Sequence, residues 1–398
     1  MVAVAQGRRV GMRTFYADFH VHIGRARGRP VKMAAAHSLT LANLLQHAAD
    51  RKGIDLVTVI DGVCPPVQLE VKQLLQAGDL AYQPGGGLRY RDRLTVILGA
   101  EVEVAGPDGG AAHFGCWFAD LETARDFADW LATVQKNPHL SSQRARVRAF
   151  ELQEQVVKRD GVFIIHHAFT PHKGMYGNCV RRMREMVNPA WVDAVELGLS
   201  ADTEMADCLD ELAAFTFLTN SDAHSLPKIA REYNRLELAT PSFAAVRDAL
   251  HRRRRHRVAA NYGLLPALGK YHRSACKRCG RPWAPGAERC ACGSDKVVLG
   301  VYDRLLQVRD RVEPVHPKHR PPYVHQVPLE FIPGLGPASR ERLFAAFGTE
   351  MAILHQASLE QLEEVVGGEM ARRIDAARRG QTRVLPGRGG IYGKLVLP

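Results

Sequence analysis

The sequence predicts an α/β fold in which residues 1–262 form a distorted seven-stranded (β/α) barrel and smaller units follow. Three observations support this prediction. Short apolar runs alternate with longer amphipathic stretches up to residue 262, four cysteines gather after residue 275, and glycine-containing turns followed by amphipathic stretches recur after residue 329. Alternating strands and helices are typical of parallel α/β folds. A chain of 398 residues with 46% hydrophobic and 24% charged residues has the composition of a globular protein with more than one domain.

The seven predicted strands are short apolar runs. They are residues 13–19, 54–60, 94–100, 111–118, 161–165, 192–197 and 215–219. Amphipathic stretches at 121–134 and 142–159 predict crossover helices. Before the second strand, Leu41, Leu44 and Leu45 share one face of a predicted helix, and Gly53 is a typical helix stop.

The formal charge of +12 is concentrated at one end of the chain. Residues 251–398 hold 26 Lys and Arg against 13 Asp and Glu, a net charge of +13, whereas the preceding residues carry a net charge of −1. Such an asymmetry is typical of a polyanion-binding appendage, and nucleic acid is the commonest large polyanion in a cytosol, although a solvated basic surface has the same composition. The run HRRRRHR at 251–257 fits either interpretation, because it could also be the exposed end of a helix that starts near Ser242.

Membrane and secretory signals are not found in the sequence. No run approaches the roughly 18 to 20 apolar residues that cross a bilayer, and the first fifteen residues contain no apolar segment before a cleavage site. Eight cysteines are too few for a disulfide scaffold in a chain of this length. We therefore expect a cytoplasmic protein without membrane contact.

Polar side chains collect at the predicted strand ends. His20 and His22 follow the first strand, Asp222 and His224 follow the last, and histidines and carboxylates end several others. The remaining members of this set are Asp61, Glu101, His113, His166 and His167. Strand ends of a barrel converge on one mouth, where imidazoles and carboxylates bind zinc, manganese or similar divalent ions. A single histidine at such a position is more often structural; several together predict a metal site.

A second metal site is predicted after the barrel, in residues 270–312. Cys276 and Cys279 form a C-x-x-C pair, and Cys290 and Cys292 would complete a tetrahedral Cys₄ site for one structural zinc. The second pair is C-x-C, a tighter spacing than usual, so free thiols are the alternative.

Residues 313–328 form a linker rich in proline and basic residues, and residues 329–385 follow as a helix-hairpin-helix region. Gly334 and Gly336 allow a close backbone approach, so that turn N–H groups could bind a DNA phosphate, with Arg340 and Arg342 beside them. A second copy surrounds Gly367 and Gly368, and residues 386–398 form a C-terminal tail. A simple packing turn between two helices is the alternative interpretation.

Four segments, DFHVHIG, LGAEVEV, HHAFTPH and LTNSDAHS, resemble the polymerase and histidinol phosphatase (PHP) metallo-hydrolases. Their order, together with ELGLSADTEM, LGKYHRSACKRCG and GGIYGKLVL, resembles the endonuclease Q-type family over nearly the whole chain. The resemblance implies a metal-ligand set and a metal-bridging role for Glu101. The implied ligands are His20, His22, Asp61, Glu101, His113, His167, Asp222 and His224. Glu101, Asp222 and His224 are the residues predicted to be catalytic.

One position departs from the family pattern. Asp61 is kept in DGVCPP, but Cys64 stands where a histidine is expected. A thiolate binds zinc well and magnesium poorly, while a small apolar role for Cys64 is an equal alternative. Asp18 resembles a partner that orients a ligating histidine, and an ordinary polar residue at a strand end is the alternative.

The resemblance implies two or three divalent ions in the barrel, zinc, manganese or magnesium. It also implies a DNA repair endonuclease that cuts damaged duplex or single-stranded DNA 5′ to uracil, hypoxanthine, xanthine or an abasic site. Metal-assisted hydrolysis of a phosphoester is the natural chemistry of such a cluster. Lys173, Lys228 and Arg231 could hold the phosphate, or could be ordinary surface residues. Tyr176 and Asn178 are candidates for the lesion pocket. The alternatives are a phosphatase acting on a small phosphorylated substrate and a non-enzymatic DNA-binding protein with a decayed barrel.

Overall fold

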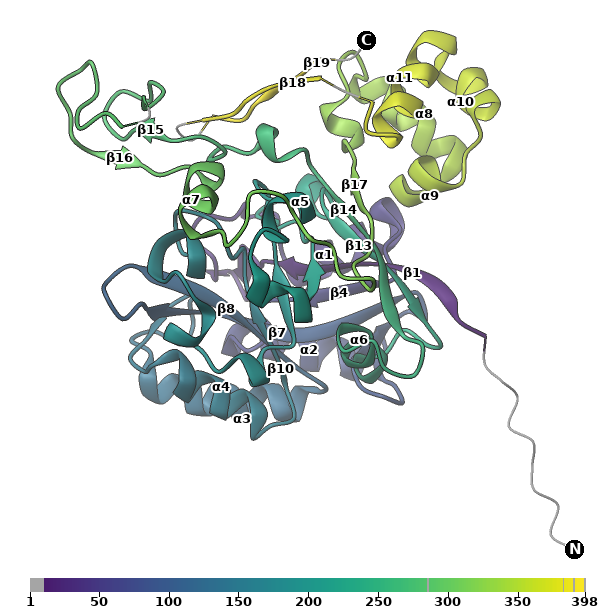
Figure 1. Ribbon diagram of the computed structural model, residues 1–398. Coiled ribbons are helices and arrows are strands. Elements are labelled where there is room, and N and C mark those ends of the chain that lie inside the picture. Colours follow the sequence, from purple (N-terminus) through teal and green to yellow (C-terminus); the bar gives the residue numbers. More distant parts are fainter. Residues whose placement is uncertain (1–10, 285, 382, 389–390, 397–398) are drawn as a thin grey trace, which may run out of the picture.

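The computed structural model describes residues 11–284, 286–381, 383–388 and 391–396. Its body is a curled mixed β-sheet with helices packed outside it (Figure 1). The cysteine-containing segment and helices α8–α11 lie above opposite sides of this body, and the β18–β19 hairpin passes between them.

The main sheet follows a path of ten strands in the order β12-β11-β10-β8-β7-β4-β1-β13-β14-β17. These strands are β1 (Arg13–Val21), β4 (Leu56–Val59), β7 (Leu94–Ala105), β8 (Ala111–Phe118), β10 (Val162–Ile165), β11 (Ala194–Glu196), β12 (Thr216–Leu218), β13 (Tyr233–Leu238), β14 (Arg257–Gly263) and β17 (Tyr323–His325). Short strands branch from it or lie beside it: β2 (Arg25–Ala26), β3 (Arg29–Pro30), β5 (Leu80–Tyr82), β6 (Leu88–Tyr90) and β9 (Arg144–Ala145).

All seven predicted strand ranges contain a strand, but the prediction of a parallel barrel is wrong. β8 is antiparallel to both β7 and β10, and β13 is antiparallel to β1. Only five residues join β7 to β8, which allows a hairpin, whereas a parallel pair needs a crossover of a dozen or more residues. The segment after β12 reaches β1 through a single parallel bridge between Val21 and Ala223, so the sheet curls back on itself without a continuous ladder.

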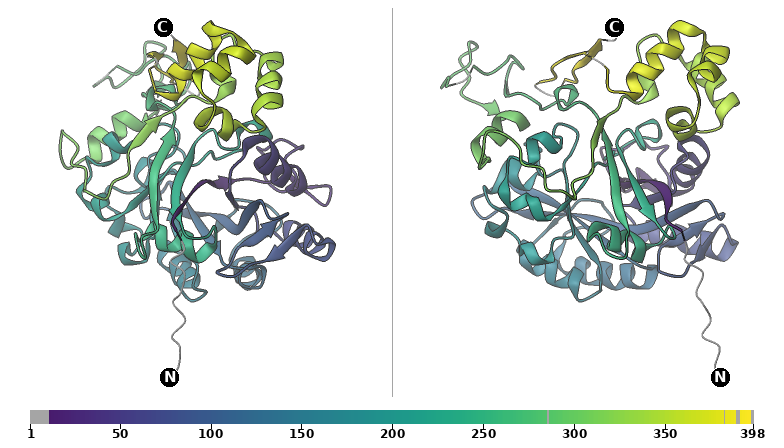
Figure 2. Two further views of the ribbon diagram at one scale, coloured as in Figure 1. Left: turned by 90° about the vertical axis from the view of Figure 1, so that its right-hand side faces the viewer. Right: turned by 45° about the vertical axis from the view of Figure 1, so that its right-hand side comes forward.

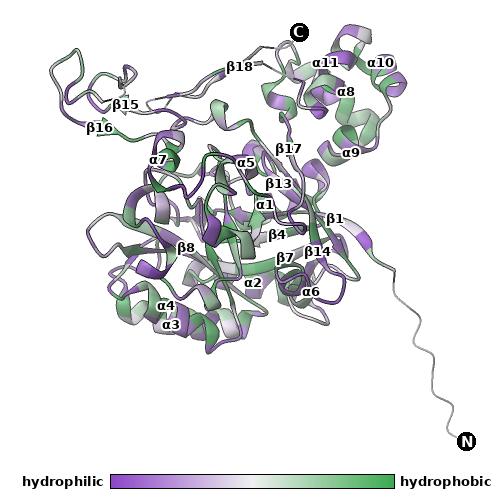
Figure 3. Ribbon diagram, viewed as in Figure 1, coloured by the Kyte–Doolittle hydropathy of each residue, from purple (hydrophilic) through white to green (hydrophobic). Residues whose placement is uncertain are grey.

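The inside of the curl is apolar. One cluster of buried side chains contains at least one residue from each of the seven predicted strands. Its members include Phe19, Trp117, Ile164 and Leu218. Helix α6 adds Phe243 to the same cluster. The hydropathy colouring of Figure 3 shows these central strands as largely hydrophobic. This packed interior fixes the strands, and thereby the residues at their ends.

Helices cover the outside of the body. They are α1 (Leu41–Gln46) with a π-helical turn at His47–Lys52, α2 (Pro65–Ala77), α3 (Leu121–Val134), α4 (Ala149–Val157), α5 (Thr203–Ala206) and α6 (Phe243–Leu250). Asp120 caps α3 by accepting a hydrogen bond from the Thr123 N–H, and α3 buries Phe127 against the sheet. Helix α4 is shorter than predicted because residues 144 and 145 pair with β7 as β9.

The C-terminal third folds back onto the body. After β15 (Ala275–Cys276) and β16 (Val297–Val298), α7 (Val301–Val308) follows, and β17, in the predicted linker, pairs with β14. Four helices come next: α8 (Pro337–Phe347), α9 (Glu350–His355), α10 (Leu359–Val366) and α11 (Gly368–Arg378). Both views of Figure 2 place these helices above α1. The Lys52 ammonium pairs with Glu350 at 2.6 Å across this contact, and both side chains are buried.

The glycine turns lie where the sequence predicts them. Gly334 has φ +84° and Gly336 is the N-cap of α8, while Gly367, with φ +81°, joins α10 to α11. The element before the first turn is only a single 3₁₀ turn, Leu329–Phe331. Strands β18 (Arg383–Leu385) and β19 (Lys394–Val396) form a hairpin in the tail.

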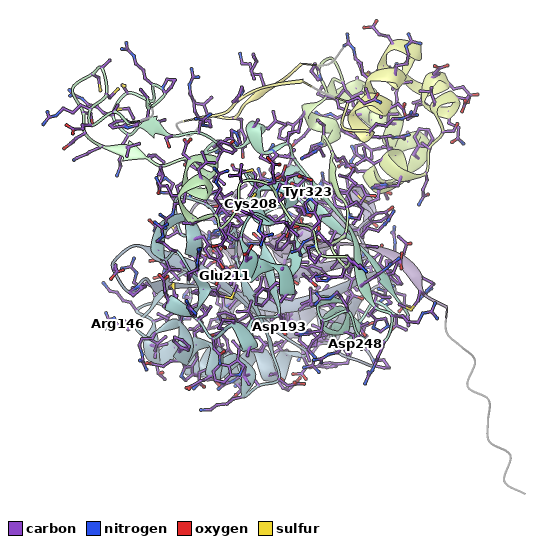
Figure 4. All side chains as sticks on the ribbon, in the orientation of Figure 1. Arg146, Asp193, Cys208, Glu211, Asp248 and Tyr323 are labelled. Atoms are coloured by element: carbon purple, nitrogen blue, oxygen red, sulfur yellow. The ribbon has the colours of Figure 1, made fainter. Side chains whose placement is uncertain are left out.

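The basic run at 251–257 connects α6 to β14, and several of its side chains contact the body although residues 252–255 are exposed. His251 contacts Asp193, Arg254 pairs with Asp248, and Arg252 donates to the Ala214 carbonyl. Asp193 and Asp248 are labelled in the lower part of the body in Figure 4, away from α8–α11. These contacts hold part of the run at this end of the sheet. Among the described helices, none combines the length and apolarity of a membrane span.

Candidate active site

The predicted ligand residues come together at one end of the curled sheet. His20 is on β1, Glu101 on β7 and His113 on β8, while His166 and His167 follow β10 directly. The pairing of β1 with β4 is irregular between Asp18 and Val21, which is the segment that holds His20. Such irregularities turn side chains toward active sites in other folds.

Two histidines and one carboxylate form the first group. Nε2 of His20 lies 3.3 Å from Nε2 of His22, and Oδ1 of Asp222 lies 3.5 Å from each of these nitrogens. The two imidazoles are fully buried. Asp222 adopts a positive φ of 45°, a backbone conformation that few non-glycine residues adopt and that is frequent at functional sites.

Glu101 lies between this first group and a second one. Its Oε2 is 3.3 Å from His20 Nε2, 2.9 Å from His113 Nδ1 and 3.3 Å from His167 Nε2. His166 Nδ1 is 3.5 Å from the same oxygen. A carboxylate in this position can bridge two cations, as the resemblance implies.

The other ring nitrogens of the first pair are held by carboxylates. His20 Nδ1 donates to Glu196 at 3.0 Å, and His22 Nδ1 donates to Asp61 at 3.2 Å. When both imidazoles are neutral, as metal ligation requires, Nε2 of each carries the lone pair, and two lone pairs that face each other cannot form a hydrogen bond. A cation near both Nε2 atoms satisfies them.

The electrostatics of the cluster also favour a cation. Burial opposes a charge on His20, yet the carboxylates of Glu196 and Asp222 raise the pKa of His20 well above its usual value. Burial lowers the pKa of His166 to about 4, with His20 acting in the same direction, so His166 is neutral at pH 7. Both ring nitrogens of His166 are buried without a hydrogen-bond partner in the described part of the chain. A buried neutral imidazole in this state fits a metal ligand.

The resemblance implies that Asp61 is a metal ligand, but its carboxylate lies behind His22 and not in the closely spaced groups. Its carboxylate accepts hydrogen bonds from His22 Nδ1 and from the Ile23 N–H at 2.6 Å, on the side of His22 away from the cluster. Asp61 therefore orients a histidine. Asp18 contacts the backbone instead of an imidazole ring, since it accepts from the N–H groups of Ser221, Ala230 and His20.

His224 lies at the rim of the cluster. Its Nδ1 donates to the Asp222 carbonyl at 2.9 Å, and its side chain is 32% exposed. Burial lowers the pKa of His224 to about 4. Nε2 of His224 therefore keeps a lone pair at pH 7, although His224 lies outside the closely spaced groups.

Two residues of the cluster were missing from the predicted ligand set. The sequence places both His166 and His167 at a strand end, but the predicted ligand set contains only His167. Glu196 ends β11, and its position at a strand end was the available signal. Residues at the ends of five other predicted strands belong to the candidate set, and the same criterion applies to Glu196.

Cys64 is buried and packs as a small apolar residue. Burial, together with the Asp61 charge, raises the pKa of the Cys64 thiol well above its usual value, so it stays protonated. It belongs to none of the potential metal-ligand groups in the described residues. Its backbone precedes α2, where its carbonyl accepts from the Val67 and Gln68 N–H groups.

A cavity of about 550 Å³ opens over the cluster. Besides Glu101, Asp222 and His224, its walls include Lys228, Arg231, Lys270, Tyr271, Ser200 and Tyr392. Tyr176 is in the core and donates to Glu211, and neither Tyr176 nor Asn178 lines this cavity. Lys173 pairs with Glu103 at 2.6 Å.

The four cysteines of the second predicted site also converge. Sγ of Cys276 lies 3.6 Å from Sγ of Cys292, and Sγ of Cys279 lies 3.6 Å from Sγ of Cys290. Sulfur atoms at this mutual distance, without disulfide bonds, fit a tetrahedral Cys₄ zinc site.

Comparisons with known proteins agree with this geometry. The chain is 44% identical over 388 residues to the protein YqxK of Bacillus subtilis, covering 96% of this chain and all of YqxK. It is 34% identical over 254 residues to MJ0043 of Methanocaldococcus jannaschii, which covers 58% of this chain and 31% of MJ0043. No family model matches the chain.

Two solved structures match the whole fold. The lesion-specific endonuclease PfuEndoQ from Pyrococcus furiosus aligns with a TM-score of 0.83 and 29% identity, covering 97% of this chain and 96% of that chain. Endonuclease Q in complex with a 27-mer duplex that has an abasic lesion at the active site aligns with a TM-score of 0.84 and 29% identity, covering 97% of each chain. The chain therefore belongs to the endonuclease Q-type family of metal-dependent endodeoxyribonucleases.

Proposed function

We propose that the protein is a metal-dependent DNA repair endonuclease that hydrolyses the phosphodiester 5′ to a deaminated base or an abasic site. The observation that carries this proposal is the cluster around Glu101, at the base of a cavity, in a chain that matches lesion-specific endonucleases over its full length. Uracil, hypoxanthine and xanthine are the proposed deaminated bases.

The residues divide into metal ligands and residues that orient them. His20, His22 and Asp222 would hold one ion, and Glu101, His113 and His167 a second. His166, with Glu101 and His20, offers a third position. Asp61 and Glu196 orient the first two histidines through their Nδ1 atoms. An imidazole-rich donor set suits zinc or manganese better than magnesium.

Bound divalent ions supply an acidic water and neutralise charge on the phosphate oxygens. The protein residues contribute the positioning. Glu101 and Asp222 are catalytic in this proposal because both carboxylates face the ions and the cavity where the phosphate would lie. His224 stands at the rim, where its Nε2 can accept or donate a proton or bind an ion.

The C-terminal third is the proposed DNA-binding surface. The backbone of the Gly334–Gly336 turn and the first turn of α8 would bind a phosphate without reading sequence, with Arg340 and Arg342 adding positive charge. The cysteine site would hold one zinc and stabilise residues 270–312. Domain boundaries at 262, 270, 312, 328 and 385 remain our proposal, with β17 of the linker contributing to the main sheet.

The two alternatives lack support from specific contacts. A phosphatase acting on small substrates needs neither the cysteine site nor the glycine turns. A non-enzymatic binder has no need of the seven convergent ligands. Deletion of residues 270–398 would not separate these cases, because it removes β17 from the sheet and Tyr392 from the cavity wall.

A cleavage assay with end-labelled duplexes tests the proposal. Each duplex carries one central uracil, hypoxanthine, xanthine or abasic site, beside an undamaged duplex, with manganese, magnesium or zinc supplied. One cut 5′ to a lesion, with the undamaged duplex intact, is the expected result. If a folded, metal-loaded protein left every duplex intact and hydrolysed a small phosphomonoester instead, the phosphatase alternative would replace our proposal.

A further inference from the structure

The C-terminal tail returns from the helical region to the cavity. The Gly387 N–H donates to the Ala267 carbonyl at 2.6 Å, and the Gly393 N–H donates to the Leu268 carbonyl at 2.9 Å. A Cβ atom at Gly393 would lie 2.8 Å from the Ala267 carbonyl oxygen, which is too close for any side chain. The tail is thus packed tightly against the segment that leads out of β14.

This packing brings Tyr392 into the cavity wall. The Tyr392 hydroxyl accepts a hydrogen bond from Nη1 of Arg231 at 2.9 Å. Arg231 is only 8% exposed, and its guanidinium also donates to the carbonyls of Ser221 and Asp222, at 2.7 and 3.4 Å. One buried guanidinium therefore ties the tail to the backbone that carries the Asp222 carboxylate.

The Tyr392 ring contacts a second cation. Nζ of Lys270 lies 4.7 Å from the ring centroid, within the range of a cation–π interaction. Lys270 also lines the cavity and is half-buried. An ammonium over an aromatic face keeps its three N–H groups as donors for an anion.

Lys270 differs from the other lysines of the cavity in its charge balance. Lys32 pairs with Glu101 at 2.9 Å, and Lys228 pairs with Glu330 at 2.6 Å. In the described part of the chain, Lys270 has no carboxylate partner within ion-pair distance. Its charge is therefore available to a ligand, while the ring of Tyr392 limits where the ammonium can go.

We propose that Tyr392 positions the Lys270 ammonium at the wall of the cavity, where Lys270 binds a phosphate of the DNA strand that is cut. This inference rests on the proposed endonuclease function and deepens it. Tyr392 is a positioning residue, since it acts through Lys270. Lys270 is a substrate-binding residue.

The same contacts relate the helical region to the cavity. Lys228 and Arg231 belong to one short segment after the Asp222 and His224 pair. Lys228 contacts Glu330 at the start of the helical region, and Arg231 contacts Tyr392 after its end. The region that we propose to bind the duplex is thus fixed at both ends to the segment beside the metal ligands.

The test is the salt dependence of cleavage of the lesion duplex that the wild type cuts best. Initial rates at 50 to 200 mM salt give KM and kcat for the wild type and for Lys270→Gln, Lys270→Arg, Tyr392→Leu and Tyr392→Phe. A lost phosphate contact lowers the slope of log KM against log salt by about one. We expect Lys270→Gln to show this change, with KM raised roughly tenfold at low salt and kcat nearly unchanged.

The conservative variants separate positioning from folding. Lys270→Arg should restore the wild-type slope, because it keeps the charge. Tyr392→Phe keeps the ring and should keep the slope, whereas Tyr392→Leu should lose it in the same way as Lys270→Gln. Thermal unfolding of each variant verifies the fold, and the half-buried Lys270 supplies a test even if Tyr392→Leu is unstable.

The inference is overturned if Lys270→Gln has the wild-type slope and KM while the wild type cleaves lesion duplexes. In that case the proposed function stands and Lys270 is not a phosphate contact. If the wild type cleaves no DNA, the proposed function fails and the inference fails with it. A loss of slope in Lys270→Gln that Lys270→Arg does not restore also overturns the inference.

Discussion

Oε2 of Glu196 lies 3.0 Å from Nδ1 of His20, and both side chains are fully buried. Asn220 donates to the same carboxylate oxygen at 2.9 Å. Burial by itself would raise the pKa of Glu196, but the proximity of His20 and His166 lowers it to about 2. Glu196 is therefore a carboxylate at neutral pH. This contact directs Nε2 of His20 toward Glu101 and Asp222.

The Glu196 contact predicts a defect in metal binding. In Glu196→Gln the ring of His20 loses a charged partner, so the variant should bind the catalytic metal about ten- to a hundredfold more weakly. Titration against a chelating indicator measures this affinity, and cleavage should recover at high metal concentration. Glu237→Gln, which removes a carboxylate paired with Arg257 elsewhere on the sheet, is the matched control. Equal metal affinity in Glu196→Gln and the wild type would contradict the orienting role.

The cysteine site predicts one zinc ion that is independent of the catalytic metals. Cys279→Ser should lower the zinc content by one ion per chain and weaken DNA binding, because residues 270–312 gain folding free energy from the metal. Zinc content is measured by atomic absorption, and DNA affinity by fluorescence anisotropy. Cys179→Ser, outside the site, should keep the zinc. An unchanged zinc content in Cys279→Ser would mean that the four thiols are free.

The glycine turn predicts binding that does not distinguish damaged from undamaged DNA. The double variant Arg340→Ala, Arg342→Ala should weaken binding of both duplexes by the same factor and reduce the salt slope by about two. kcat at saturating DNA should be nearly unchanged, because neither arginine lines the cavity. A selective loss for the lesion duplex would place these arginines in lesion recognition instead.

The fully buried carboxyl of Glu232 predicts a pH effect on stability. Its Oε1 accepts from the Leu264 N–H at 2.8 Å, and burial raises the pKa of Glu232 to about 8. The folded state then holds a proton that the unfolded chain releases above about pH 4.5. The contribution to stability is complete below that pH and is lost as the pH rises through about 8, by up to about 5 kcal/mol.

The substitution Glu232→Gln removes the titrating carboxyl group and keeps the size of the side chain. Its thermal unfolding midpoint should match that of the wild type at pH 5 and exceed it at pH 8.5, with metal content held constant. Differential scanning calorimetry at both pH values measures the difference. Parallel pH profiles for the two proteins would show that Glu232 does not carry the effect.

The buried pair of Lys52 and Glu350 predicts the strength of the contact between the helical region and the body. Glu350→Gln leaves the Lys52 ammonium buried without a counter-charge, which costs about 3 to 5 kcal/mol. Hydrogen exchange of residues 329–378 should accelerate strongly. Glu341→Gln breaks the exposed pair with Arg51 in the same contact and should change exchange little. Similar exchange in the two variants would show that the buried pair does not hold the helices.

The apolar runs predicted the seven strands, because burial of their side chains requires that composition. The antiparallel direction of β8 could have been predicted, since the five residues between β7 and β8 are too few for a crossover connection. β13 and β14 were missed although YNRLEL in β13 alternates buried and partly exposed residues, the pattern of a strand at a sheet surface. The place of β13 in the sheet depends on its pairing with β1, which is more than two hundred residues away, and β14 in turn pairs with β13.

The ligand cluster was largely predictable because strand ends converge. The roles of the two carboxylates Asp61 and Glu101 could not be predicted from the sequence. Both follow predicted apolar strands, and they differ only in the direction of the side chain. The Asp61 carboxylate contacts Nδ1 of His22, on the side away from the cluster, whereas the Glu101 carboxylate points into the cluster. The position of Tyr392 in the cavity wall could not be predicted from the sequence, because it depends on how the whole C-terminal third folds back onto the body.

The central claim is that the His20, Glu101 and Asp222 cluster is a metal centre that cuts DNA. The most direct measurement is a metal titration of chelator-stripped protein, with metal stoichiometry and single-turnover cleavage of a one-lesion duplex recorded on the same samples. We predict that cleavage 5′ to the lesion appears as two or three ions bind beyond the structural zinc, and that Asp222→Asn abolishes both the tight binding of one ion and the cut. Full cleavage by stripped protein, or by an Asp222→Asn variant that binds fewer ions, would contradict the claim.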